Sequence, residues 1–94
     1  MNKEITIGRI IHVVLPHTGP VVGTYERPGI IVRTWGSESA VNVQVFTDGY
    51  NDGSGCPTIW KTSLAHDPTG QTPNTWHWPD EAKDEAKPAP SANA

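Results

Sequence analysis

Alternating runs of apolar and polar residues, many of them β-branched, recur along the chain and are separated by segments rich in glycine and proline. These runs predict strands over residues 5–14, 29–35, 40–47, 58–65 and 75–78. No stretch before the C-terminal tail has helical periodicity. About five short strands joined by such loops predict an all-β fold, a small and strongly bent β-barrel of the SH3-like or OB-like kind.

The segment 40–47 has the clearest alternation. Three valines, Val41, Val43 and Val45, share one face of the predicted strand, and Asn42, Gln44 and Phe46 share the other. We expect the valine face to form core and the other face to meet solvent, a ligand or another subunit.

Other segments give weaker signals. Gly8 inside the first run indicates a bend or bulge, and the prolines and glycine of 15–20 predict a loop. The segment 21–29 is compatible with a long excursion or a short edge strand, with Arg27-Pro28-Gly29 as a turn.

Size and charge limit what the chain can be. Its 94 residues suit one small domain, which often gains stability by oligomerising, so we expect a homo-oligomer. Residues 1–79 carry five Lys/Arg against six Asp/Glu, and we assign them to the barrel. Residues 80–94, with two against four, contain a tandem DEAK repeat and are expected to be an acidic, Ala/Pro-rich disordered tail. The net charge of -3 argues against duplex nucleic acid as a partner.

The single cysteine, Cys56, allows no intrachain disulfide and fits a reducing compartment. No signal peptide and no membrane-spanning run are visible. We therefore expect a cytoplasmic protein with no membrane contact.

The sequence DGYNDGSG, residues 48–55, has some features of a metal loop or a phosphate loop. Read as an EF-hand from Asp48, it has Tyr50 at the third position and Ile59 at the twelfth, where oxygen ligands are needed. No Gly-Lys-Ser/Thr follows, which excludes a Walker loop. We interpret it as a long hairpin loop whose acidic residues and glycines accept positive φ.

Neither a metal site nor catalysis is predicted. Zinc sites have close ligand pairs, and His12 and His17 are the only histidines spaced that way. This pair spans the end of a predicted strand and a proline turn, and Cys56 is far from it in the sequence, so we do not expect a zinc site there. His77 lies between two tryptophans, which favours packing and hydrogen bonding. The available serines and Cys56 lack a nucleophile motif, so the sequence predicts no metal, no cofactor and no enzyme.

Aromatic and cationic side chains are the remaining candidates for a ligand-binding site. Aromatic faces stack on bases, arginine forks grip phosphates, and amides read base edges. Packing for each tryptophan and surface ion pairs for the arginines are the competing interpretations. The candidate ligand-binding residues are Arg9, His12, Arg33, Trp35, Asn42, Gln44, Asp48, Tyr50, Asn51, Trp60 and Trp76.

Three stretches together resemble a family of small, mostly uncharacterised phage and prophage proteins. They are GRIIHVVLP (8–16), VNVQVFTDGYNDG (41–53) and TWHWPDE (75–81). The family shows a G-R-I-V-H opening, a V-N-L-Q-V-F-x-D-G-x-N-D centre and a W-H-W-P-E close. The resemblance covers most of residues 7–81 and implies a viral or prophage origin.

A weaker resemblance is one of kind. In size, compartment and absence of a catalytic motif, the chain is similar to phage "sponge" proteins, which hold immune nucleotide signals without cleaving them. The resemblance implies that the chain sequesters a small nucleotide, cyclic or linear, in the infected host cell and so counteracts anti-phage defence. The alternative is a protein-interaction module that binds a host or phage protein through a tryptophan-lined groove.

Overall fold

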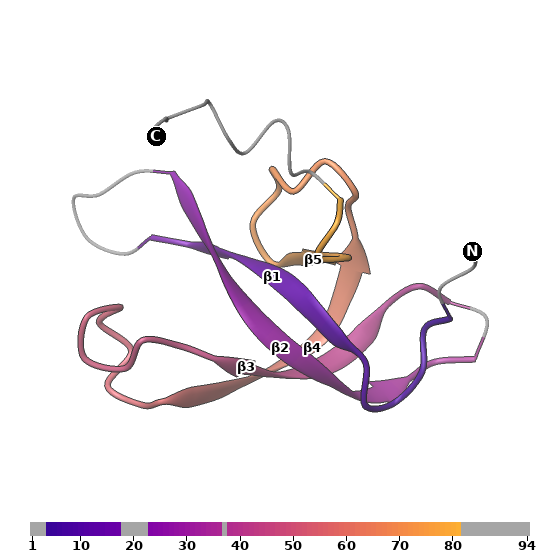
Figure 1. The fold of residues 1–94 in the computed structure, drawn as a ribbon, viewed down its shortest axis with the longest axis horizontal. Helices are drawn as coiled ribbons and strands as arrows, with labels where there is room; N and C mark the ends of the chain where they lie inside the picture. Colours follow the sequence, from indigo (N-terminus) through magenta and orange to yellow (C-terminus); the bar gives the residue numbers. More distant parts are fainter. Residues whose placement is uncertain (1–3, 18–22, 37, 82–94) are drawn as a thin grey trace.

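The computed structural model describes residues 4–17, 23–36 and 38–81. Its strands are β1 (Ile10–Pro16), β2 (Thr24–Thr34), β3 (Val41–Phe46), β4 (Thr58–His66) and β5 (Thr75–His77). Each strand pairs with the next, and β5 pairs back with β1, which closes a barrel (Figure 1). The predicted all-β fold with five strands is confirmed. The expected disordered tail falls largely on residues 82–94, outside the described residues.

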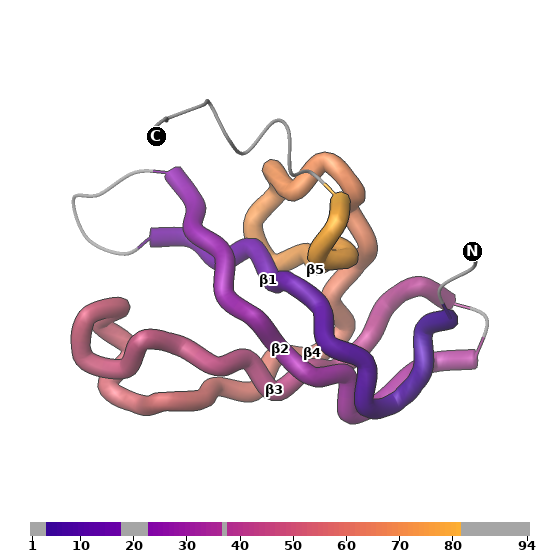
Figure 2. The backbone as a smooth tube through the Cα atoms, viewed as in Figure 1, coloured from indigo at the N-terminus to yellow at the C-terminus, as the bar shows by residue number. Residues whose placement is uncertain are grey.

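The strand order is consecutive and has no crossover. All neighbours are antiparallel except β4 and β5, which run parallel because the turn-rich segment 67–74 carries the chain back before β5 begins. Figure 2 shows this path, with β5 beside β1 and β4. A consecutive order contains no Greek-key connection, which distinguishes this barrel from the OB-like alternative.

Alternation along the strands fills the barrel interior. Val41, Val43 and Val45 are fully buried, so the predicted core face of β3 is confirmed. The core cluster consists of these valines with Ile11, Val13, Leu15, Ile31, Leu64, Trp76 and Trp78.

Gly29 lets the strands of the barrel approach each other closely. A Cβ at this position would overlap Cγ1 of Val43 and lie 3.0 Å from the carbonyl oxygen of Gln44. A side chain here would therefore push β2 away from β3.

The first strand lies later in the sequence than predicted. It begins at Ile10 and continues through Pro16, so the loop expected from residue 15 is wrong at its first two positions. Gly8, with φ of +96°, forms the expected bend. Its backbone N–H donates to the Ile31 carbonyl, and the Ile31 N–H donates to the Arg9 carbonyl, so the chain enters the sheet beside β2.

The turn expected at Arg27-Pro28-Gly29 is also wrong, because β2 runs through these residues without interruption. Pro28 lies opposite His12 of β1, whereas the pairing of β2 with β3 begins only at Gly29. At Pro28 the strand thus has a paired neighbour on one side. An edge of this kind tolerates a residue without an N–H group.

Asn42 departs from the outward-facing pattern expected for its face of β3, since only 7% of it is exposed. Its side-chain oxygen accepts hydrogen bonds from the Thr62 hydroxyl at 2.9 Å and from the Ser63 N–H at 2.8 Å. Ser63 has a φ of 57°, and the β3–β4 register shifts here. Asn42 therefore holds a bulge in β4 and is committed to the fold.

Candidate functional site

The outward face of the sheet carries two groups of side chains. Because neighbours across a ladder share a face, the register places Ile10, Ile30, Gln44 and Trp60 in one row across β1, β2, β3 and β4. Phe46 lies two residues beyond Gln44 on the same face. We call these five residues the apolar strip.

The apolar strip is exposed. Ile10 is 57%, Trp60 56% and Phe46 43% exposed, and Ile30 and Gln44 are half-buried. The strip contains no charged side chain. Contiguous exposed apolar surface on a small domain marks an interaction site more often than isolated apolar residues do.

Next to the strip lies a second group, which we call the His–Glu cluster. It consists of His12 on β1, Glu26 on β2 and His77 on β5, whose ligand atoms all lie within 4.8 Å of one another. His12 and His77 are directly opposite across the β1–β5 ladder. One oxygen of Glu26, Oε1, lies 3.3 Å from Nδ1 of His12 and 3.4 Å from Nε2 of His77.

The two histidines differ in their surroundings. His12 is partly open, and with Glu26, Arg27 and Pro28 it lines a surface hollow of about 250 Å³. His77 is 1% exposed, and its Nδ1 is a buried atom without a hydrogen-bond partner. Buried polar atoms in native proteins nearly always have partners, so an unpaired one indicates a water, an ion or a functional role.

Arg27 follows Glu26 in β2, so strand alternation directs its side chain to the other face, where it binds the 48–55 loop. Its Nε and Nη2 donate to the two carboxylate oxygens of Asp52, at 2.7 and 2.5 Å. The Asp48 N–H also donates to Asp52 at 2.7 Å. The hydrogen bonds from Arg27 lower the pKa of Asp52 below its ordinary value of 3.8. We call this group the Arg27–Asp52 latch.

The latch fixes the loop that connects the antiparallel strands β3 and β4, and this pairing confirms that DGYNDGSG is a hairpin loop. Gly49, Gly53 and Gly55 have positive φ as expected, but Asp48 and Asp52 do not, so that part of the interpretation is wrong. Within the loop, Asn51 donates to the Asp48 carboxylate at 3.3 Å. Tyr50 is 93% exposed at the loop tip.

A second histidine–glutamate pair joins the segment after β5 to β4. Nε2 of His66 lies 2.9 Å from the Glu81 carboxylate, and the His66 ring stacks on Trp76 with 4.3 Å between ring centroids. Burial raises the pKa of Glu81, but the hydrogen bonds from His66 and the Trp78 N–H outweigh it, so the net pKa lies below the ordinary value. The contacts of the barrel thus reach two residues past the expected boundary at 79.

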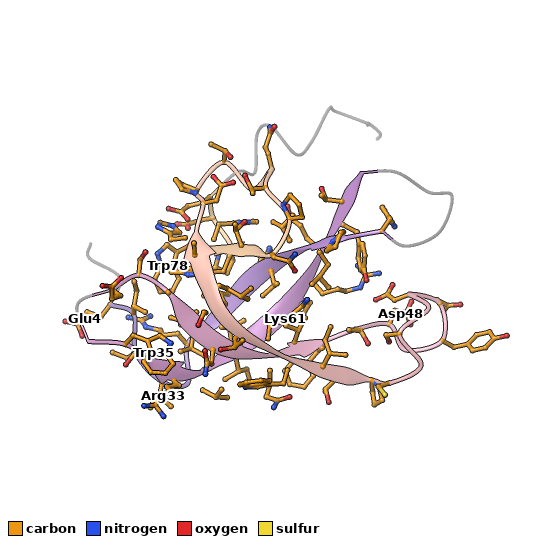
Figure 3. All side chains as sticks on the ribbon, turned by 180° about the vertical axis from the view of Figure 1, so that it is seen from behind. Glu4, Arg33, Trp35, Asp48, Lys61 and Trp78 are labelled. Atoms are coloured by element: carbon orange, nitrogen blue, oxygen red, sulfur yellow. The ribbon has the colours of Figure 1, made fainter. Side chains whose placement is uncertain are left out.

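Three of the predicted ligand residues lie at one end of the barrel. The guanidinium carbon of Arg33 stands 4.2 Å from the Trp35 ring centroid. That of Arg9 stands 5.7 Å from the Trp78 ring centroid, and Arg9 Nε donates to the Glu4 carbonyl. Figure 3 shows Glu4, Arg33, Trp35 and Trp78 on the same side of the molecule.

The other predicted residues do not join them. Asp48 lies at the opposite end in Figure 3, and Tyr50 and Asn51 belong to the same loop. Trp76 is fully buried, and its indole N–H donates to the Ser39 carbonyl, so its ring is core rather than a stacking surface. The predicted set is therefore distributed over two ends, the outward face and the core.

Sequence reasoning missed Glu26 and the partnership of His77 with His12. It also missed Ile10 and Ile30 as members of an exposed surface, whereas the outward position of Phe46 was expected and is confirmed. The alternation along each strand was visible, but the cross-strand register that joins these residues depends on where β1 and β2 begin. A prediction that β2 continues through Arg27-Pro28-Gly29, in place of a turn there, would have placed Glu26 opposite β1.

Comparison with protein-family models, curated proteins and solved structures gives no significant match. Among the described residues there is no helix with the length and apolar character needed to cross a membrane.

Proposed function

We propose that this barrel is a protein-interaction module that docks a partner protein on the apolar strip. The observation that carries the proposal is the cross-strand row Ile10–Ile30–Gln44–Trp60 on the outside of the sheet, with more than half of Ile10 and Trp60 exposed. Covering these side chains removes apolar surface from water, which is the main source of affinity at protein interfaces.

The shape of the strip favours a protein over a small ligand. Small molecules bind in concave pockets that bury most of their surface. The strip instead lies on the outer surface of a closed barrel, where a flat or groove-shaped partner can cover several side chains at once. This differs from the predicted tryptophan groove, because Trp60 is the only tryptophan of the strip and Trp76 is buried.

The composition of the strip defines the chemistry of the partner. With no charge on the strip, we expect an uncharged apolar patch, including a group that can hydrogen-bond to the Gln44 amide. An aromatic side chain buries roughly 150–250 Å². Five residues are thus a hot spot within an interface of about 800 Å² per partner, rather than the whole of it.

The test compares two exposed aromatic residues. The original chain is used to capture proteins from a lysate of the cells that produce it. Each captured candidate is then purified and titrated with the original chain, with Trp60→Ser, with Ile10→Ser and with the control Tyr50→Ser. We expect an identified partner whose dissociation constant rises about 30-fold or more with Trp60→Ser and less than twofold with Tyr50→Ser.

Two outcomes would overturn this proposal. One is a purified partner that binds the Trp60→Ser variant as well as the original chain. The other is a stable oligomer of the original chain, measured by light scattering, that Trp60→Ser converts to a monomer. In that case the strip is an oligomer interface and not a docking surface.

The nucleotide-sequestering hypothesis is the second candidate, and the Arg9–Arg33–Trp35 end supports it. Two guanidinium groups lie there beside aromatic rings, an arrangement suited to a phosphate and a base. Native mass spectrometry with cyclic and linear nucleotides tests it. A stoichiometric mass shift that Arg33→Gln abolishes and Trp60→Ser leaves intact would replace the first proposal.

A further inference from the structure

We propose that His12, Glu26 and His77 bind one divalent transition-metal ion, for which Zn²⁺ is the probe of choice. The site is independent of the proposed docking function, although it lies on the same outward face. Three strands supply one ligand each, and all three ligand atoms lie within 4.8 Å of one another.

Two of the three distances in the cluster match those between atoms bound to one metal ion, and the two histidine nitrogens lie within 4.8 Å of each other. Two atoms bound to a tetrahedral zinc ion at its usual bond lengths are about 3.3–3.4 Å apart. The two histidine nitrogens lie 3.3 and 3.4 Å from Oε1 of Glu26. The His12–Glu26 contact is also a long hydrogen bond at 3.3 Å, whereas the His66–Glu81 pair of this protein has the shorter distance of 2.9 Å that is usual for a charged pair.

The donor set selects the class of ion. Two imidazole nitrogens and one carboxylate oxygen suit zinc and the neighbouring first-row divalent metals. Calcium and magnesium prefer oxygen ligands throughout. The single negative charge of Glu26 would be neutralised by the ion, and the two neutral imidazoles supply their lone pairs.

We place the fourth coordination position of the ion in the surface hollow beside the cluster. His12 and Glu26 line this hollow of about 250 Å³, which is large enough for a water molecule or a side chain of a bound molecule. Three protein ligands with one open position is the arrangement of zinc sites that exchange a ligand, as opposed to closed structural sites with four.

The surroundings of His77 set the expected affinity. When Nε2 binds the ion, Nδ1 carries the ring proton, and Nδ1 has no hydrogen-bond partner. Loss of such a supporting partner weakens metal binding about 10- to 100-fold. We therefore expect a dissociation constant in the micromolar range, weaker than that of a closed structural zinc site.

The test is titration of the tag-free, chelator-treated full chain with Zn²⁺ by calorimetry, and with Co²⁺ by visible absorption. We expect one ion per chain and a Co²⁺ spectrum with the intense bands of tetrahedral coordination. Glu26→Gln and His12→Gln should each weaken binding about tenfold or more. His66→Gln, which alters the other histidine–glutamate pair, is the matched control and should leave binding unchanged.

Metal-free thermal unfolding of each variant verifies that it folds. Absence of stoichiometric binding to the folded original chain at about 100 times the expected dissociation constant would overturn the proposal. So would binding that survives both Glu26→Gln and His12→Gln, or binding that His66→Gln abolishes, because the ion would then occupy a different site.

Discussion

Two polar groups start from adjacent residues of β2 and differ in how completely they are satisfied. On one side of the strand, Arg27 and Asp52 form two hydrogen bonds of 2.5–2.7 Å, and the Asp48 N–H adds a third. On the other side, the contacts of Glu26 with His12 and His77 measure 3.3 and 3.4 Å, and Nδ1 of His77 has no partner.

The difference separates polar groups that serve the fold from polar groups that are available for binding. The latch joins the β3–β4 loop to β2, and its short bonds leave both Asp52 oxygens occupied. The His–Glu cluster joins three strands that are already paired through their backbones, so the ladder does not depend on it. Side chains with incomplete hydrogen bonding at such a place retain capacity for a ligand.

Gly29→Ala should have the broadest effect, because it displaces the strand that carries both groups. The new methyl would overlap Val43 and crowd the Gln44 carbonyl. We expect the free energy of unfolding to fall by about 1–3 kcal/mol, measured by urea titration followed through tryptophan fluorescence. A variant as stable as the original would show that β2 can move away from β3 without cost.

Replacing two buried polar residues by leucine tests the comparison directly. Asn42→Leu leaves the Ser63 N–H without its acceptor and should lower the free energy of unfolding by about 1–3 kcal/mol. His77→Leu, in the presence of a chelator, removes a buried group whose bonding is incomplete and should change it by less than about 1 kcal/mol. Equal losses in the two variants would contradict the distinction between the groups.

Acid titration should separate the latch from the rest of the protein. Because the folded pKa of Asp52 is lowered, its contribution to stability is complete above its ordinary pKa of 3.8 and is lost as the pH falls through the folded value. Asp52→Asn lacks that contribution at every pH. We therefore expect the stability gap between the original chain and Asp52→Asn to be constant near neutrality and to narrow below about pH 4.

Other acidic groups do not disturb this measurement. Hydrogen bonds from Thr69 and Thr72 lower the pKa of Asp67, and Glu81 also has a lowered pKa. The stabilising contributions of both residues are lost on acidification in the original chain and in the variant alike, so they cancel in the stability difference between the two. A gap that stays constant down to pH 2, or that widens, would rule out the latch as a stabilising ion pair.

Local patterns in the sequence predicted the strands and the core of β3. The alternation of Val41, Val43 and Val45 is a property of adjacent residues, and burial of one face follows from it. The path of β2 through Pro28 could not be read in the same way, because a proline and a glycine together favour a turn. Pairing with β1 overrides that preference.

The candidate site was less accessible because it depends on register. His12 and Glu26 are 14 residues apart in the chain, and His77 comes from the last strand. No spacing rule for zinc ligands joins such residues, and only the closure of β5 onto β1 does so. Asn42 was misjudged for a similar reason, since the bulge at Ser63 that turns it into a buried acceptor has no local signature.

Trp60→Ser should have the smallest effect on stability and the clearest effect on binding. Because 56% of Trp60 is exposed, the folded protein loses little packing when the ring is removed, and we expect a change of about 0.5 kcal/mol or less in the free energy of unfolding. Tyr50→Ser should be equally neutral. If Trp60→Ser instead destabilises the isolated chain by as much as Asn42→Leu, the ring stabilises the fold of the barrel. The apolar strip would then not be a docking surface.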